Sequence, residues 1–481
     1  MENIVNGLNA ILWSTPVIYI LLGVGLVFSV LTRFLQVRHI REMVKLMFKG
    51  KSSAAGVSSF QALSIALSGR VGTGNIAGVA TAIFYGGPGA VFWMWAIAFI
   101  GASSAFVEST LAQIYKVKQD GQYRGGPAYF IERGIGWKWF GMLFAIAALI
   151  AMAILMPGVQ SNSIAAGMDN AFNIPPWLTG IVIISLLGFI ILGGVKRIAS
   201  TAQILVPFMA IGYMIFSIVI IAMNIQLLPE VIALIFKSAF ALDSAFGGII
   251  GMAIMWGVKR GVFSNEAGQG TGAHAAAAAE VSHPAKQGLV QAFSVYIDTL
   301  FVCSATAFMI LFTGMYNTQT EDGKGFIVHN LEGVEQGPGY TQAAVDSILP
   351  GFGAGFVAVA LFFFAFTTIM AYYYIAETNI AYLFRKQNTK SVMFILKIVI
   401  LIATFWGTVR TAELAWALGD VGLGIMVWLN VIAIVILARP ALLALKDYEQ
   451  QKKLGLDPVF DPKKLGIKNA TFWENYKKES E

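Results

Sequence analysis

The sequence predicts an all-α polytopic membrane protein with eleven transmembrane helices. Of its 481 residues, 57% are hydrophobic and only 12% are charged, and the mean hydropathy is +0.71. Soluble proteins carry about 25% charged residues, so this composition excludes a soluble domain. Eleven apolar stretches are long enough to cross a bilayer, and the basic residues gather between alternate stretches.

The predicted spans begin close to the N-terminus. A membrane-spanning helix needs about 20 mostly apolar residues. The first ten residues, MENIVNGLNA, lack the basic region of a cleaved signal, so we expect the first span to stay in the mature protein. The predicted spans are 11–32, 60–84, 88–115, 138–160, 175–194, 201–223, 244–262, 287–315, 350–376, 392–409 and 413–438.

The lysine and arginine residues predict the orientation of these spans. If the N-terminus is outside, 28 of the 33 basic residues fall in the inner loops and the C-terminal tail. The exceptions are Lys237, Lys324 and Arg410 outside, and Arg70 and Lys397 within spans. This asymmetry predicts a multi-pass protein of the plasma (inner) membrane with a cytoplasmic C-terminus. The count places Lys259 and Arg260 at the inner surface.

Three segments outside the spans have distinct compositions. Residues 34–51 carry apolar side chains on one helical face and basic ones elsewhere, which predicts a cytoplasmic amphipathic helix or a plain basic connector. The apolar face contains Phe34, Val37, Ile40, Val44, Met47 and Phe48. The tail, 439–481, is polar, basic and too short for an enzyme domain. The loop 317–349 is acidic, and we expect it to cover the outer mouth.

The second predicted span contains a motif that is hostile to a helix, SGRVGTGNIAG at 68–78. Each glycine costs a helix interior about 1 kcal/mol relative to alanine, and an intramembrane arginine costs about 3 kcal/mol. A helix that opens at Gly72–Gly74 would free carbonyl groups near Ser68 for a cation. The N–H groups of the following half-helix would favour an anion. The alternative is a glycine kink packed against a neighbouring helix.

The ninth span offers further oxygen ligands. Thr367 and Thr368 are adjacent, and Tyr372 lies one turn beyond Thr368. Hydroxyl oxygens suit a hard cation, whereas threonines in membrane helices also bond back to their own helix. Glu377 and Asn379 follow near the inner end, as gate or surface residues.

Charged residues within the spans need partners. Asp298 in the eighth span lies at a depth similar to that of Arg70, and the two are predicted to form an ion pair. Glu108, nearer the inner side, is the rival partner. The seventh span runs into GVKRGVFSNEAGQGTG, 257–272, whose glycines and Ser-Asn-Glu cluster predict non-helical backbone near the inner end.

Several chemistries find no support in the sequence. One cysteine, Cys303, excludes an intrachain disulfide, and the four histidines are too scattered for a metal site. The chain has no GxxxxGK[ST] phosphate loop, and no loop shows a nucleophile–base motif or a metal-ligand set. We therefore expect no enzyme activity, no cofactor and no nucleic-acid partner.

Three motifs give the chain a specific resemblance. GGPGAVFWMWAIAFIG (86–101), VGTGNIAG (71–78) and RGVFSNEAG (260–268) resemble hallmarks of the alanine or glycine:cation symporter family, the sodium–alanine symporters. The resemblance implies a leucine-transporter fold with two inverted five-helix repeats and broken helices. It assigns 60–223 to the first repeat, 244–438 to the second and 1–33 to an extra N-terminal helix.

The resemblance also implies a binding site. A sodium ion would be held by carbonyls near Ser68 and Val71 and by the hydroxyls of Thr367 and Thr368. Asn75 would lie beside the substrate or a second cation. The implied substrate-binding residues are Gly72, Thr73, Gly74, Asn75, Gln160, Thr368 and Tyr372. The run Met156-Pro157-Gly158 departs from the Gly-Asn-Met expected there, which affects the wall that selects side-chain size.

The resemblance implies a sodium-coupled symporter that imports a small neutral amino acid, with alanine first and glycine next. The alternatives of the same fold are a proton-coupled carrier, for which Asp298 or Glu108 would titrate, and a carrier that prefers glutamine or serine. A channel lacks support because no charged pore ring is present.

Overall fold

The computed structural model describes residues 2–50, 52–243, 245–385 and 387–474, and it is mostly helical. Lys51 and residues 475–481, at the ends of two predicted segments, lie outside the described residues. The elements of the first half are α1 (Glu2–Leu12), α2 (Thr15–Leu31), α3 (Leu35–Arg38), α4 (Ile40–Met47), α5 (Ser59–Arg70), η1 (Gly74–Gly78), α6 (Val79–Gly86), α7 (Gly89–Ile114), β1 (Val117–Gln119), β2 (Gln122–Arg124), α8 (Pro127–Phe130), η2 (Ile131–Ile135), α9 (Lys138–Ile150), η3 (Ala151–Leu155), α10 (Met156–Phe172), α11 (Pro176–Ile191), α12 (Gly194–Met223), η4 (Ile225–Leu227) and α13 (Leu228–Ala239).

The second half is built in the same way, from long helices and two short strands. Its elements are η5 (Gly247–Ile249), α14 (Ile250–Asn265), α15 (Thr271–Ala278), α16 (Pro284–Val295), η6 (Tyr296–Cys303), α17 (Ser304–Thr313), β3 (Asn317–Gln319), β4 (Phe326–His329), α18 (Pro338–Ile348), α19 (Gly353–Leu383), α20 (Lys390–Thr408), α21 (Ala412–Ile436) and α22 (Ala438–Lys453). Each strand pair, β1–β2 and β3–β4, is an antiparallel hairpin.

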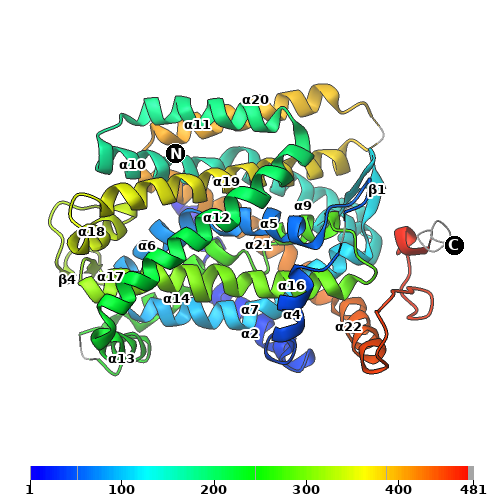
Figure 1. The fold of residues 1–481 in the computed structure, drawn as a ribbon, viewed down its shortest axis with the longest axis horizontal. Coiled ribbons are helices and arrows are strands. Elements are labelled where there is room, and N and C mark those ends of the chain that lie inside the picture. The colour runs from blue at the N-terminus through cyan, green and yellow to red at the C-terminus, as the bar shows by residue number, and fades with distance from the viewer. Residues whose placement is uncertain (1, 51, 244, 386, 475–481) are drawn as a thin grey trace.

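The long helices run side by side along the longest axis of the molecule (Figure 1). The β1–β2 hairpin, α4 and α22 lie at one end, the α22 end, and α13, α18 and β4 lie at the other, the α18 end. In the interior, α7 packs against α14 and α16, while α10 packs against α19, α20 and α21. The buried core is dominated by alanine, isoleucine, leucine and aromatic side chains.

The predicted spans correspond to helical segments of two kinds. Among the described residues, seven helical segments are long and apolar enough to cross a membrane, and the pair α1–α2, bent by 42°, makes an eighth. The predicted span 175–194 is the shorter apolar helix α11. The span 60–84 lacks a single long helix because it is interrupted, and the span 244–262 is the 16-residue helix α14, which ends at an interruption after Asn265. The structure therefore shows a polytopic helical membrane protein, with two broken helices.

The first interruption lies close to its predicted position. A capping box at Ser58 and Gln61 starts α5, which ends at Arg70, and Val71 leaves the helix with a ψ of 87°. The non-helical residues are Val71 and Gly72, because Thr73 already has helical backbone angles (φ −56°, ψ −30°) and η1 begins at Gly74. The predicted opening at Gly72–Gly74 overlaps this break at Gly72.

The second interruption differs from the prediction. α14 ends at Asn265, Glu266 takes a left-handed conformation with φ 57°, and α15 begins at Thr271. We expected this non-helical stretch near the inner end of its span. It lies in the buried interior, where a Cβ added to Gly69 would be 3.1 Å from Glu266 Oε2 and one added to Gly74 would be 2.9 Å from the Cα of Ser264. The two interrupted helices therefore pack against each other.

The predicted amphipathic helix is two short helices, α3 and α4, joined at His39. Five of the six apolar side chains that define its predicted face are exposed; these are Phe34, Val37, Ile40, Val44 and Phe48. Met47 is buried with Met43 and Leu46 and belongs to the opposite face. The prediction for Met47 was wrong because this residue lies between exposed Ile40 and buried Met43 around the axis of α4, at the border of the two faces.

The C-terminal segment folds back onto the α22 end. The indole Nε1 of Trp473 donates to the carbonyl of Gln113 at 2.8 Å. The Lys116 ammonium lies 4.4–5.2 Å from the ring centroids of Tyr123, Phe472 and Trp473 and donates to the Ala279 carbonyl. Burial lowers the pKa of Lys116 to about 7, while the aromatic faces favour its charged form.

Candidate functional site

The candidate site lies where the two helix interruptions meet. Glycine is required at two positions of the first interrupted helix, Gly72 and Gly74, because side chains of other helices lie close to the backbone there. A Cβ at Gly72 would be 3.1 Å from Gln160 Oε1 and closer still to Thr368 Oγ1, and one at Gly74 would press on Ser264. Backbone groups of the break can therefore be approached closely by side chains from three other helices.

Gln160 joins the first break to helix α19. Its Oε1 accepts from the Thr73 backbone N–H at 3.0 Å, and its Nε2 donates to the Tyr372 hydroxyl at 3.1 Å. All three residues are buried, and among the described residues the hydroxyl of Thr73 has no hydrogen-bond partner. The structure thus brings together Thr73, Gln160 and Tyr372, which the resemblance assigned to the substrate.

The two adjacent threonines of α19 point in different directions. Thr368 Oγ1 lies 2.8 Å from the Ser68 carbonyl oxygen, across the bundle, and 3.0 Å from the Phe364 carbonyl. Thr367 Oγ1 instead lies 3.0 Å from the Phe364 carbonyl and faces the sulfur of Met209. The structure brings Thr368 to the break beside Ser68 and Val71, and it does not bring Thr367 there.

Asn75 connects the break to helix segment η6. Its Oδ1 accepts from the Gly72 backbone N–H at 2.8 Å, and its Nδ2 donates to Asp298 Oδ1 at 2.7 Å. Asp298 also accepts from the hydroxyls of Ser264 at 3.0 Å and Thr299 at 2.7 Å. Three donors therefore satisfy this buried carboxylate without a cation in contact with it.

The predicted ion pair between Arg70 and Asp298 is wrong as a direct contact. The Arg70 guanidinium donates to Gln291 and to the hydroxyl of Ser294, and no carboxylate within the described residues pairs with it. The rival partner does not reach it either, because Glu108 accepts from Asn430 at 2.8 Å and from the Gly270 N–H at 3.1 Å.

Arg70 is compensated at longer range. Glu266, Glu108 and Asp298 all interact with its charge electrostatically. Gly272 makes room for it, because a Cβ there would collide with the guanidinium. The prediction failed because the short side chains of Asn75, Thr299 and Ser264 donate to Asp298 and occupy the positions that an arginine would need.

Lys259 and Arg260 are not at a surface, contrary to the sequence-based expectation. Both are buried, and both pair with Asp420 of α21, at 2.6 Å and 2.9 Å. Arg260 also lies 4.4 Å from the ring centroid of Trp416. The expectation was wrong because the helix continues past these residues into the bundle, where the carboxylate of Asp420 forms ion pairs with both side chains.

Replacing Asp420 with asparagine is expected to destabilise the protein by about 3–5 kcal/mol, because it leaves two buried cations with no counter-charge. The measurement is thermal unfolding of the purified protein in detergent. Glu413→Gln is the matched control, since Glu413 is exposed on the same helix, and we expect it to cost less than about 1 kcal/mol. Equal melting temperatures for the two variants would contradict this role of Asp420.

All the residues predicted to bind substrate are buried in this structure. Two cavities of about 480 and 390 Å³ lie toward the α18 end, and Trp416 lines both, but no residue predicted to bind substrate lines either. The acidic loop contributes to both cavities through Gln336, as expected of a segment that covers this mouth. The ring of Trp416 packs against the ring of Phe263, the residue that precedes Ser264 in the sequence.

Buried polar contacts close the site toward the α22 end. Arg124 of β2 pairs with Glu377 of α19 at 3.2 Å, and Asn379 lies 3.0 Å from His274 of α15. Glu377 and Asn379 are therefore interior residues, so the expectation of surface residues is wrong. The gate alternative stays a prediction.

Sequence reasoning missed several residues of the site. Ser264 and Cys303 both contact Asn75 or Asp298, and the carboxylate of Glu266 lies against Gly69 and accepts from Thr271 at 2.7 Å. The Ser-Asn-Glu cluster in the glycine-rich 257–272 segment was the available signal. The sequence contains no signal for Gln291 and Ser294, because an isolated polar residue in a helix cannot be assigned to a site before its neighbours are known.

Comparison with known sequences settles the family. The model of the sodium:alanine symporter family matches residues 1–462. The chain belongs to this family. A Bacillus subtilis (strain 168) member, YrbD, is 79% identical over 482 residues, covering 100% of this chain and 99% of the relative, and is named provisionally as a sodium/proton-dependent alanine carrier. The sodium/proton-dependent alanine carrier protein of Bacillus sp. (strain PS3) is 61% identical, covering 90% of this chain and 97% of the relative.

A solved structure shares the fold of this family member. The manganese transporter of Eremococcus coleocola superposes with a TM-score of 0.53 at 13% identity, covering 89% of this chain and 95% of that chain. This likeness extends to the fold alone. The relatives are carriers and the structural neighbour is a membrane transporter, and none of the three is named as an enzyme.

Proposed function

We propose that this chain is a sodium-coupled symporter that imports a small neutral amino acid, preferably alanine, through the plasma membrane. Family membership and the names of the two Bacillus relatives support this function. The observation that carries it is the hydroxyl of Thr368, which meets the Ser68 carbonyl at the edge of a helix interruption. Oxygen ligands of this kind suit Na⁺, and a broken helix offers them in the interior.

The proposal gives the site residues separate roles. Na⁺ is bound by the carbonyls of Ser68 and Val71 and by the hydroxyl of Thr368. Thr367 is left out of this set because its hydroxyl faces Met209. The substrate carboxylate binds the backbone and hydroxyl of the break, and its remaining contacts come from the polar side chains that surround it. These substrate residues are Gly72, Thr73, Gly74, Asn75, Gln160 and Tyr372.

The proposed architecture has eleven spans in two inverted repeats, 60–223 and 244–438, preceded by an extra helix. The two interruptions are then the broken first helices of the repeats, which explains why they pack against each other. The N-terminus is outside and the α22 end is cytoplasmic. In this orientation, Trp416 with the Arg260–Asp420 pair forms the outer closure, and Arg124 with Glu377 forms the inner one. Transport requires these closures to open alternately.

The coupling energy is sufficient for concentrative uptake. Each Na⁺ gains about 2.3 kcal/mol per 100 mV of membrane potential. A tenfold sodium gradient adds about 1.4 kcal/mol. The total of about 3.7 kcal/mol supports accumulation of several hundredfold with one Na⁺ per substrate.

The test is uptake of labelled L-alanine into proteoliposomes that contain the purified chain. An inward sodium gradient is expected to drive accumulation above the equilibrium level, and a matched potassium gradient is not. Unlabelled alanine, glycine, serine and glutamine, each added with and without sodium, then rank the substrates. Uptake that ignores the sodium gradient would contradict the proposal.

Proton coupling is the second candidate, because the names of both Bacillus relatives include protons and the site holds the buried carboxylates Asp298 and Glu266. In the same proteoliposomes, an inward proton gradient without sodium distinguishes the two. Accumulation under that condition would establish a proton as the coupling ion. Its absence, together with sodium-driven uptake, would exclude the proton route.

A further inference from the structure

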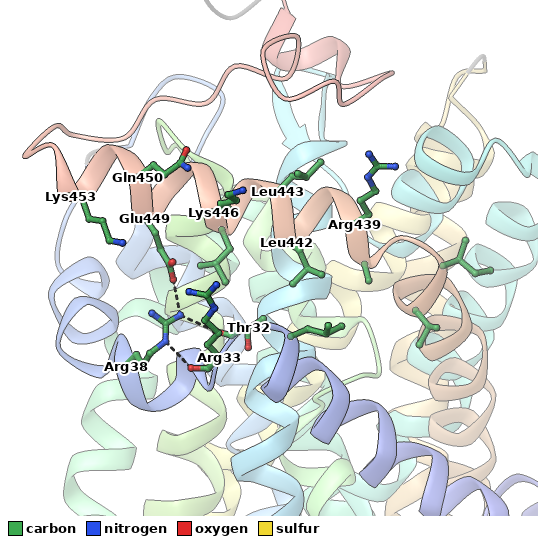
Figure 2. Close-up of a pocket in the computed structure, with 15 residues that line it drawn as sticks. Thr32, Arg33, Arg38, Arg439, Leu442, Leu443, Lys446, Glu449, Gln450 and Lys453 are labelled. Atoms are coloured by element: carbon green, nitrogen blue, oxygen red, sulfur yellow. Dashed lines mark hydrogen bonds and ion pairs between the residues drawn. The ribbon is translucent and has the colours of Figure 1, made fainter.

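A basic pocket of about 630 Å³ lies at the α22 end (Figure 2), and no residue of the proposed transport site lines it. The ends of α2 and α21 meet α3 and α22 there. Five cationic side chains and one carboxylate line this pocket. These residues are Arg33, Arg38, Arg439, Lys446, Lys453 and Glu449.

Most of this positive charge is uncompensated. Glu449 accepts from Arg38 Nη2 and from His39 Nε2, each at 2.8 Å. Within the described residues, the other four cations of the basic pocket form no ion pair. Like charges that line one pocket repel each other, so an anion among them is favoured.

The backbone at the corner of α2 and α3 holds two of these cations in place. Arg33 and Phe34 are consecutive non-glycine residues in the left-handed region, with φ of 54° and 53°. Such conformations persist only where the surroundings enforce them. Arg38 enforces the turn by donating to the carbonyls of Thr32 and Arg33. As a result, the guanidinium groups of Arg33 and Arg38 both point toward α22 (Figure 2).

The floor of the basic pocket is apolar and open to the side of the bundle. Leu31 of α2 is 52% exposed, and Val435 and Ile436 of α21 are each 49% exposed. Leu442 points from α22 back toward α2 (Figure 2). A soluble anion gains nothing from such a floor, whereas a molecule with a negative head and hydrocarbon chains matches both parts.

We propose that the basic pocket binds the phosphate headgroup of an anionic phospholipid from the cytoplasmic leaflet. The acyl chains would follow the exposed apolar faces of α2 and α21. This site is separate from the transported solute. It relies only on the orientation in the proposed function, which puts the α22 end at the inner surface.

The test measures lipid binding to the purified full chain by native mass spectrometry. The probes are dioleoylphosphatidylglycerol and dioleoylphosphatidylcholine, which have the same acyl chains, and sn-glycerol 3-phosphate as a water-soluble anion. Phosphatidylglycerol is expected to bind about tenfold more tightly than phosphatidylcholine. Neutralising the pocket in Arg33→Gln/Lys446→Gln/Lys453→Gln is expected to weaken that binding at least about tenfold.

Two further variants separate this site from general charge and from misfolding. Lys463→Gln/Lys464→Gln/Lys468→Gln removes the same charge from exposed tail positions and is expected to keep phosphatidylglycerol binding. Lys446→Arg/Lys453→Arg preserves charge and is also expected to keep it. Equal binding of the two lipids, equal loss in the tail variant, or displacement by glycerol phosphate at equal concentration would overturn the proposal. Alanine uptake is not a readout, so the result is independent of the transport proposal.

Discussion

The Gly72→Ala variant is expected to lose alanine transport almost completely. A Cβ at this position would collide with Thr368 Oγ1 and lie 3.1 Å from Gln160 Oε1, so it would push apart the two side chains that close the site around the break. Displacing binding groups by about 1 Å costs about 100-fold in a tightly positioned site. The measurement is the initial rate of sodium-driven uptake in proteoliposomes at matched protein content.

Gly78→Ala is the matched control for this substitution. It lies in the same interrupted helix, and the nearest atom to an added Cβ is 3.8 Å away, which is ordinary van der Waals contact. We expect it to transport within about twofold of the parent, since a helical glycine-to-alanine change is favourable by about 1 kcal/mol. Transport by Gly72→Ala at the rate of Gly78→Ala would show that the break does not form the site.

The Thr368→Val variant is expected to raise the sodium concentration for half-maximal uptake by about 10–100-fold. Valine keeps the shape of threonine but removes the oxygen that meets the Ser68 carbonyl, and losing one such buried partner costs about 1–3 kcal/mol. The experiment titrates sodium at a fixed alanine concentration. It also measures the melting temperature of the variant, so that a folding defect is detected separately.

Thr367→Val provides a control one residue away. Its hydroxyl faces Met209 and its own helix, so we expect sodium dependence to change by less than about threefold. If Thr367→Val loses sodium dependence and Thr368→Val keeps it, the proposed cation site is wrong. A full sodium dependence in both variants would also contradict it.

The helix break was predictable because its causes are local. Gly72 and Gly74 weaken a helix by an intrinsic backbone cost, and Arg70 is expensive in an apolar environment whatever surrounds it. The long spans were predictable for a similar reason, since length and hydropathy are properties of the sequence alone. The structure adds that the interrupted and short helices at 60–84, 175–194 and 244–262 do not form single long spans.

The direction of a side chain around its helix was not predictable. Thr367 and Thr368 are chemically identical and differ by about 100° around the helix axis, so only the packing of α19 decides which one meets the break. The same holds for Met47, which lies at the border of two faces of α4 and is buried only because of how that helix packs.

Charge partners depend on residues that are far apart in the sequence. Asp298 looked like the partner of Arg70 by depth alone, but Ser264, Thr299 and Asn75 reach it first. Lys259 and Arg260 looked like an inner surface because positive charge beside an apolar stretch usually marks its end. In the interior, the Asp420 carboxylate forms ion pairs with both side chains.

The sequence by itself determined the membrane class, the family and the position of the first helix break, since these follow from composition, hydropathy and motifs along one stretch of chain. Only the tertiary structure decided that the two interrupted helices touch, that Gln160 bridges Thr73 and Tyr372, and that Arg70 pairs with no carboxylate of the described residues. The physical reason is that hydrogen bonds and ion pairs are selected by distances of a few ångströms between helices, and a sequence specifies those distances only through the packing of the whole bundle.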